Sequence, residues 1–172
     1  MTDAVMYAKY NQDSNRIIYD ILSGMPSEER EKNRGSHFSL AGGLNHMAGS
    51  TVYFLEMFKP ALAGNANALK AISALPALPM EEPRGDEQWK KFGEALCAID
   101  AAYVGMAEAL GDSDMKLPVK LDWYDGNPDS VPIYYLLAQV VVHNAHHRGQ
   151  ISQTLDELKI ENNVYEMHFL PE

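Results

Sequence analysis

Cysteine is almost absent from this chain, which has Cys97 alone among its 172 residues. A single cysteine cannot form an internal disulfide, and small proteins of oxidising compartments commonly depend on such bonds. This scarcity agrees with a reducing compartment and a cytoplasmic location. No histidine neighbours Cys97 in the sequence to activate its thiol, so we interpret it as a small core residue.

Runs of basic residues are also absent. The chain has 14 lysine and arginine residues against 24 aspartate and glutamate residues, which gives a formal net charge of −10. Such a surface repels a phosphate backbone, and no local basic stripe offsets it. We therefore expect no nucleic-acid partner.

Long apolar stretches are the third absence, because nowhere do eighteen apolar residues run together. A membrane-spanning helix needs about that number. The opening MTDAVMYAKYNQD also lacks the basic and apolar regions of a secretory signal. These features predict a soluble cytoplasmic protein with no membrane partner.

What the chain does contain is enough apolar side chain to build a core. Hydrophobic residues make up 46% and charged residues 22% of the sequence, as in ordinary globular proteins. A chain of 172 residues suits one domain. No internal repeat or second boundary is visible, so we expect a single domain over residues 1–172.

The apolar residues recur with the period of amphipathic helices in four segments. Gly24 and Pro26 end the first, Ser36 or Ser39 begins the second, Pro60 stops it, and Ser130 is the candidate cap of the fourth. The predicted helices cover residues 4–22, 36–59 or 39–59, 89–110 and 132–159.

The connections between these segments complete the predicted architecture. Residues 60–86 contain four prolines and an alanine-rich tract, which favours a long connector with one possible short helical turn. The stretch KLPVKLDWYDGNPDS suggests a small extended excursion rather than a sheet. The predicted fold class is all-α: a four-helix bundle with a long crossover between the second and third helices.

The fourth predicted helix carries HNAHHRGQ, in which three of the six histidines of the chain fall within five residues. His143 and His147 are one turn apart on the row that is otherwise mostly aliphatic, so they are expected to face the bundle interior. His146 belongs to a more polar flanking row. Two imidazoles at this spacing can converge on one metal ion.

A third ligand must come from another helix, and His46 in the second predicted helix is the obvious supplier. Small residues surround it in the sequence, so the helices could approach closely there; they are Gly42, Gly43, Gly49 and Ser50. The alternative is that these histidines are hydrogen-bonded core residues, which buried histidines more often are. His37 and His168 are expected at the surface or in the tail.

Several stretches resemble the DinB-like family of four-helix bundles. GSHFSLAGGLNHMAGSTVYFL resembles its second-helix segment, where phenylalanine and serine precede an LNH step, and VVVHNAHHRGQISQTLDELKI resembles its second hallmark, a histidine ahead of an HRGQ run. YNQDSNRIIYDIL is similar to the first helix of the family and MHFLPE to its usual ending. The resemblance spans nearly the whole chain.

The resemblance implies a divalent metal, commonly nickel or zinc, held by three histidines that map onto His46, His143 and His147. It also implies kinship with thiol-dependent S-transferases that use low-molecular-weight thiols, and it makes a homodimer the expected assembly. Members often carry a tryptophan near the position of Asp13 and Ser14, so the resemblance implies a more polar pocket wall here.

Three functions are compatible with such a site. A metal held by neutral imidazoles lowers the pKa of a bound water or thiol, which suits a thiol S-transferase acting on a small electrophile. A metal-dependent hydrolase is the second hypothesis, although the sequence shows no general base. The third is a non-catalytic metal- or ligand-binding module of a stress response.

Two neighbours of the histidines have open roles. Arg148 is placed at the flank of the helix, where we favour an ion pair or a packing role over contact with an anionic substrate. Gln150 either holds a ligand imidazole through a hydrogen bond or faces solvent. Tyr7, Tyr10, Tyr53 and Trp123 either line a pocket mouth or belong to the core.

Overall fold

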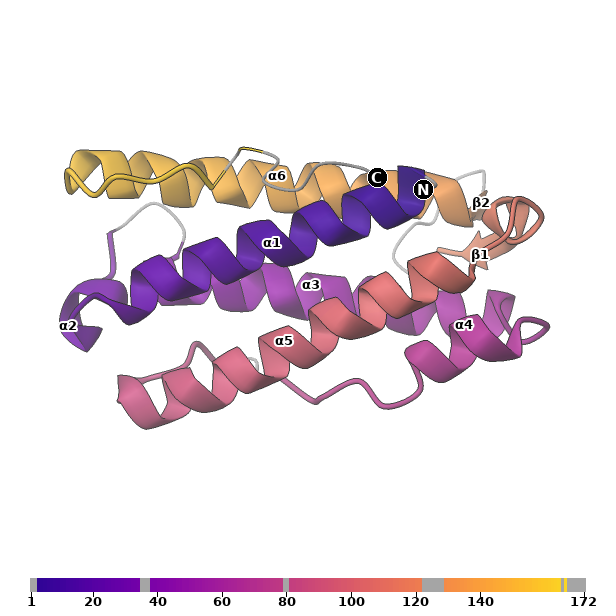
Figure 1. Cartoon of the computed structure of the whole chain (residues 1–172), viewed down its shortest axis with the longest axis horizontal. Helices are drawn as coiled ribbons and strands as arrows, with labels where there is room; N and C mark the ends of the chain where they lie inside the picture. The colour runs from indigo at the N-terminus through magenta and orange to yellow at the C-terminus, as the bar shows by residue number, and fades with distance from the viewer. Residues whose placement is uncertain (1–2, 35–37, 79–80, 122–128, 165, 167–172) are drawn as a thin grey trace.

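The computed structural model describes residues 3–34, 38–78, 81–121, 129–164 and 166. Four long helices lie alongside one another (Figure 1), and they are α1 (Asp3–Ser23), α3 (Leu40–Ala61), α5 (Gly85–Ala109) and α6 (Ile133–Glu157). The chain between α3 and α5 runs back along the length of the bundle, so these two helices point the same way. The all-α fold class and the long crossover agree with the prediction.

The short elements lie in the connections. They are α2 (Ser27–Arg30), α4 (Ala66–Ala71), the 3-10 turn Asp114–Lys116, β1 (Pro118–Lys120) and β2 (Ser130–Pro132). α4 is the short helical turn expected in the crossover, whereas the sequence analysis missed α2. The predicted extended excursion contains a small antiparallel sheet, because Val119 of β1 pairs with Val131 of β2.

Helix ends follow local chemistry, with two departures from the prediction. The Ser39 side chain caps α3 by accepting a 2.9 Å hydrogen bond from the Gly42 amide. α3 continues through Pro60, because the Leu62 amide still bonds the Phe58 carbonyl at 3.0 Å. Ser130 lies in β2 and does not cap α6, whose N-cap is Pro132.

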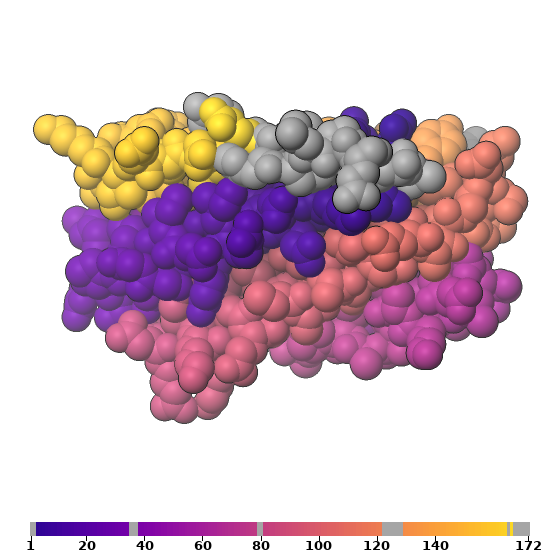
Figure 2. All heavy atoms as spheres, viewed as in Figure 1, coloured from indigo at the N-terminus to yellow at the C-terminus, as the bar shows by residue number. Residues whose placement is uncertain are grey.

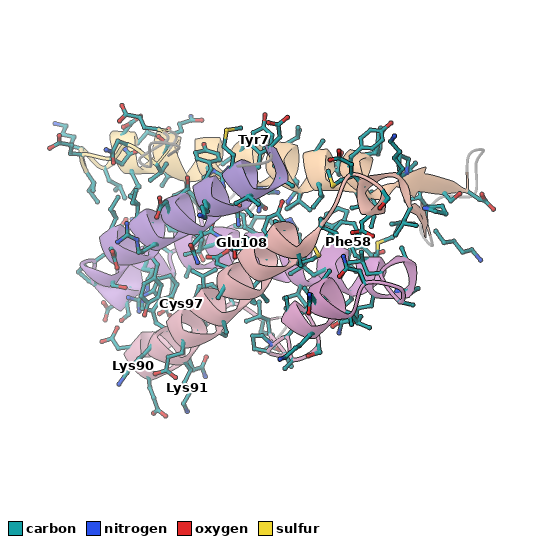
Figure 3. All side chains as sticks on the ribbon, turned by 45° about the vertical axis from the view of Figure 1, so that its right-hand side comes forward. Tyr7, Phe58, Lys90, Lys91, Cys97 and Glu108 are labelled. Atoms are coloured by element: carbon teal, nitrogen blue, oxygen red, sulfur yellow. The ribbon has the colours of Figure 1, made fainter. Side chains whose placement is uncertain are left out.

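The core consists of two apolar clusters, one toward each end of the bundle. The first contains Phe58, Tyr103 and Leu136, and the second contains Leu44, Trp89 and Leu155. Figure 3 labels the buried Phe58 on α3, together with Tyr7 on α1, which is 41% exposed and therefore not a core residue.

A buried group of polar side chains, which we call the polar layer, lies on the same four helices between the two clusters. Its members are less than 5% exposed and are Asn11, Ser14, Asn15, Thr51, Asp100, Asn144 and Arg148. Burial of polar groups is costly unless they are hydrogen-bonded. The fold must therefore provide internal hydrogen-bond partners for the side chains of the polar layer.

The view of all atoms in Figure 2 shows side chains of α1 and α5 meeting along one face of the bundle. Among the described residues these two helices form the most extensive helix pair. The polar layer lies beneath this face, since Asn11 of α1 donates to Asp100 of α5. The two pockets that the predicted ligand histidines line are formed instead by α3, α6 and the connections.

Candidate metal centre

Three histidines from two helices meet in the bundle. One ring nitrogen each of His46 on α3 and of His143 and His147 on α6 lies within 4.8 Å of the others. The Nε2 atoms of His46 and His143 are 3.1 Å apart. All three side chains are half-buried. The structure thus brings together the three residues that the sequence analysis selected as ligands.

Small residues of α3 allow this approach in part. A Cβ atom at Gly43 would lie 3.4 Å from the Ile151 side chain on α6, which is a tight contact. A Cβ at Gly42 would lie 2.6 Å from an oxygen of Glu82 in the crossover. Gly49 has no atom within 4 Å of such a Cβ. Gly43 therefore serves the contact between helices, and Gly42 makes room for the crossover.

Amide oxygens lie beside the Nδ1 atoms of the two α6 histidines. His147 Nδ1 is 2.8 Å from Gln150 Oε1, and His143 Nδ1 is 3.3 Å from Asn144 Oδ1. An amide oxygen only accepts, so each Nδ1 carries the hydrogen and each Nε2 keeps its lone pair. Gln150 thus has the orienting contact considered in the sequence analysis rather than facing solvent.

The electrostatic setting favours neutral rings. The pKa of His147 is lowered to about 4, chiefly by burial and also by the neighbouring imidazoles, while the hydrogen bond with Gln150 opposes the shift. Burial and His143 also lower the pKa of His46. Neutral imidazole is the form that binds a metal.

The donor set fits a transition-metal ion. A tetrahedral zinc ion bonds imidazole nitrogens at 2.0–2.1 Å and so holds them about 3.4 Å apart. The observed separations of 3.1 Å and up to 4.8 Å lie around that value. Three imidazole nitrogens and no lysine or arginine side chain within the cluster make a site that could hold a divalent ion.

His146 stays outside this cluster, as predicted. Its side chain is exposed, and its ring meets the edge of His147 at a centroid distance of 5.0 Å. His37, His168 and Trp123, for which other roles were considered, lie outside the described residues.

Two pockets open beside the histidines. The larger, about 600 Å³, is lined by His46 and His143 together with mainly apolar residues such as Tyr53 and Leu78. The smaller, about 300 Å³, is lined by His147 and by polar residues that include Arg34, Gln150 and Thr154. Both have room for parts of a small molecule.

Phe38 contributes to both pockets. Its ring stacks on His46 at 4.7 Å and meets His147 edge-on at 5.9 Å. The side chain is 42% exposed. Phe38 therefore forms part of the wall between the two pockets and covers one side of the imidazoles.

Glu82 is a polar residue of the larger pocket that the sequence analysis missed. It lies in the crossover, accepts a 2.5 Å hydrogen bond from the Ser39 hydroxyl and pairs with Arg84. It lines the same pocket as His46 and His143. The acidic EEPRG stretch was visible, but the pattern of the sequence did not reveal that the crossover folds back onto the start of α3.

Two predictions from the sequence are wrong at the level of single side chains. Arg148 does not lie at the flank, because it is 1% exposed and belongs to the polar layer. Cys97 is exposed on α5 (Figure 3) rather than packed in the core. Ser14, where a more polar pocket wall was expected, is fully buried and lines neither of the two pockets beside the histidines.

The fold and the cluster define the class of protein: an all-helical bundle whose two facing helices present three histidines beside open pockets. The chain belongs to the DinB family, whose model matches residues 1–165. No curated protein and no solved structure matches it. Among the described residues no helix is long and apolar enough to cross a membrane.

Proposed function

We propose that this protein binds one divalent transition-metal ion, nickel or zinc, through His46, His143 and His147 and transfers a low-molecular-weight thiol to a small electrophile. The observation that carries the proposal is three converging imidazoles, two of them already oriented by amides, that border two different pockets. When bound, the ion supplies positive charge that lowers the pKa of a thiol.

The two pockets suit two substrates of different polarity. The larger one is mainly apolar and accommodates the body of an electrophile. The smaller one offers the Arg34 guanidinium and the Gln150 amide, which suit the charged and polar groups of a thiol metabolite. Phe38 separates the two and shields one face of the site from water.

Glu82 is the residue we assign to proton transfer. Its carboxylate lines the pocket beside His46 and His143, and the Ser39 hydroxyl holds one of its oxygens. It takes the thiol proton while the sulfur forms a bond to the electrophilic carbon. The leaving group departs with the bonding electron pair.

The test measures conjugation directly. Metal-loaded protein is incubated with 1-chloro-2,4-dinitrobenzene and with glutathione, cysteine or another low-molecular-weight thiol, and thioether formation is followed. We expect turnover that is lost in His147→Ala and retained in His146→Ala. Glu82→Gln should lower kcat by about 100-fold or more while retaining the metal. Absence of conjugation with every thiol tested would refute the transferase proposal.

A metal-dependent hydrolase is a second candidate, which Glu82 specifically favours. The sequence showed no general base, whereas the pocket that His46 and His143 line also contains the Glu82 carboxylate. Hydrolysis of p-nitrophenyl acetate, dependent on both Glu82 and the metal, would support this candidate. If metal removal lowers the melting temperature but no substrate is turned over, the protein is a non-catalytic binding module.

A homodimer is also proposed. Tyr134, Tyr135 and Val142 on α6 are 53%, 56% and 64% exposed, and the last two lie seven residues apart on one helix face. Pairing of this face with a second copy would remove apolar surface from water. A monomer mass in small-angle scattering at micromolar concentration would refute the dimer.

A further inference from the structure

A continuous chain of hydrogen bonds leads from His143 into the polar layer. His143 Nδ1 lies 3.3 Å from Asn144 Oδ1, and Asn144 Nδ2 donates to Asn11 Oδ1 at 2.7 Å. Asn11 Nδ2 in turn donates to Asp100 Oδ1 at 3.1 Å. The chain crosses from α6 through α1 to α5 and joins a carboxylate in the core to a histidine of the site.

The direction of this chain is fixed at its inner end. The Arg148 guanidinium can only donate, and its Nη1 donates to Asn11 Oδ1 at 3.1 Å. Asp100 Oδ1 accepts from Asn11 on the other side. Reversing the Asn11 amide would set its NH₂ group against Arg148 and its oxygen against Asp100. Both contacts would be repulsive, so Asn11 has one orientation.

That orientation is passed outward to the imidazole. Because Asn11 presents its oxygen, Asn144 must present its NH₂ group to Asn11, and the same group also donates to Thr51 Oγ1 at 3.3 Å. Asn144 Oδ1 is then left facing His143 Nδ1. An acceptor at that position keeps the hydrogen on Nδ1 and frees Nε2.

We infer that Asp100 and Arg148 are positioning residues of the metal centre, which act through Asn11 and Asn144 to hold His143 as its Nδ1–H tautomer with Nε2 available for the ion. The inference rests on the proposed metal site and does not depend on which reaction the protein catalyses.

Protonation of Asp100 leaves this arrangement intact. Burial raises the pKa of Asp100 to about 8, while hydrogen bonds from Asn15 and Asn11 and the charge of Arg148 oppose the shift. Oδ1 accepts from both amides, at 3.0 Å from Asn15 and 3.1 Å from Asn11. Oδ2 accepts only a longer bond of 3.3 Å from Asn15, so a proton belongs on Oδ2 and Oδ1 remains the acceptor that orients Asn11.

A purely structural role for the polar layer would have different consequences. Asn15 serves as the matched control, because it donates to both oxygens of Asp100 and yet is not part of the chain to His143. Its replacement weakens the packing of the same carboxylate without altering the amides that lead to the imidazole. A role in packing alone predicts equal effects of Asn15 and Asp100 variants on the site.

The experiment compares Asp100→Ala with Asn15→Ala in two measurements. Zinc affinity is measured by competition with a chromophoric chelator, and the His143 tautomer is read from ring ¹⁵N chemical shifts in metal-free protein. An alanine at position 100 offers no acceptor to the Asn11 NH₂ group, so the Asn11 amide loses one of the two contacts that fix its orientation. We expect about tenfold weaker zinc binding and a mixture of His143 tautomers. Asn15→Ala should keep affinity within about twofold and retain the wild-type tautomer.

Unchanged affinity and tautomer in Asp100→Ala, or an equal loss of affinity in Asn15→Ala, would overturn the inference. If Asp100→Ala does not fold, Asn11→Ala cuts the same chain and should give the same loss and mixture. If the wild-type protein binds no zinc, the proposed metal site fails. The tautomer in metal-free protein then decides separately whether the chain orients His143.

Discussion

Two pairs of residues on α6 are offset by one position along the helix and face different regions of the molecule. His143 and His147 are half-buried and border the pockets, whereas Asn144 and Arg148 are 0% and 1% exposed and face the polar layer. Successive residues of an α-helix are turned by about 100°. The same two turns of helix therefore present metal ligands on one side and the supports for those ligands on the other.

The comparison teaches that a polar site on a helix need not stop at the residues that face the ligand. Arg148 stacks on Tyr10 with its guanidinium carbon 4.7 Å from the ring centroid, and it also donates to Asn11. Its charge is enclosed by protein, while the imidazoles keep access to the pockets. Changes to Asn144 or Arg148 should mainly lower the free energy of unfolding. Changes to His143 or His147 should mainly weaken metal binding.

Replacing Arg148 with alanine should have the largest effect. The change removes a buried cation, its hydrogen bond to Asn11 and its stacking on Tyr10, and it leaves Asp100 without a compensating charge. Loss of a buried hydrogen bond to a charged group costs about 1.5–3 kcal/mol, and the cavity left by the side chain adds to this loss. Urea unfolding of metal-free protein measures the loss. A decrease in the free energy of unfolding of less than about 1 kcal/mol would show that the buried Arg148 side chain does not stabilise the fold.

For the histidine pair we expect a loss of metal binding rather than a loss of stability. His147→Ala should weaken zinc or nickel binding by at least about 100-fold, because two nitrogens remain from three. The exposed His146, one position earlier, provides the matched variant, and His146→Ala should bind within about twofold of wild type. Elemental mass spectrometry of tag-free protein checks both. Equal metal content in the two variants would contradict the assignment of ligands.

Gln150→Ala tests a residue that contacts the proposed metal ligand His147 but does not itself bind the metal. Its amide oxygen lies 2.8 Å from His147 Nδ1, and loss of such a partner costs about tenfold or more in metal affinity. Gln139→Ala, at an exposed position of the same helix, is the control. Isothermal titration with zinc distinguishes them, and the idea fails if both variants bind equally well.

Acidification should have the smallest effect. The pKa of His147 is lowered to about 4 in the folded protein, chiefly by burial, from its ordinary value of 6.5. A depressed histidine pKa means that the unfolded chain takes up the proton first, so metal-free protein loses stability as pH falls from about 6.5 toward 4. After allowance for exposure the loss is about 1 kcal/mol, or about 3 °C in melting temperature.

His147→Gln removes this titrating group and should make the acid-induced drop in melting temperature smaller, whereas His146→Gln should leave it as in the wild type. Thermal scans at pH 7, 6 and 5 provide the comparison. A larger acid-induced drop in His147→Gln than in wild type would mean that the folded state does not disfavour protonation of this ring.

The long helices and the histidine cluster could be predicted from the sequence because both depend on spacing within one segment. Apolar residues at helical period located α1, α3, α5 and α6 within a few residues. The interval between His143 and His147 placed them on one face. Proline and capping rules were less reliable, as Pro60 and Ser130 show, because a helix end also depends on the elements packed against it.

The remainder of the site depends on contacts between distant segments. Arg148 looked like a flanking residue because its charge suggests exposure, and its buried partners Asn11 and Asp100 are 137 and 48 positions away in the chain. Glu82 gave no signal because only the path of the crossover brings it into the pocket that His46 lines. Periodicity within one helix cannot predict such pairings.

The polar layer also fixes the axial alignment of the helices. Two apolar clusters alone would tolerate sliding of α1 along α5 by one turn, since one aliphatic side chain can replace another. Sliding would remove Asn11 from Asp100 and from Asn144 at once and leave these groups buried without partners. The hydrogen bonds in the middle of the bundle thus set the register between the helices.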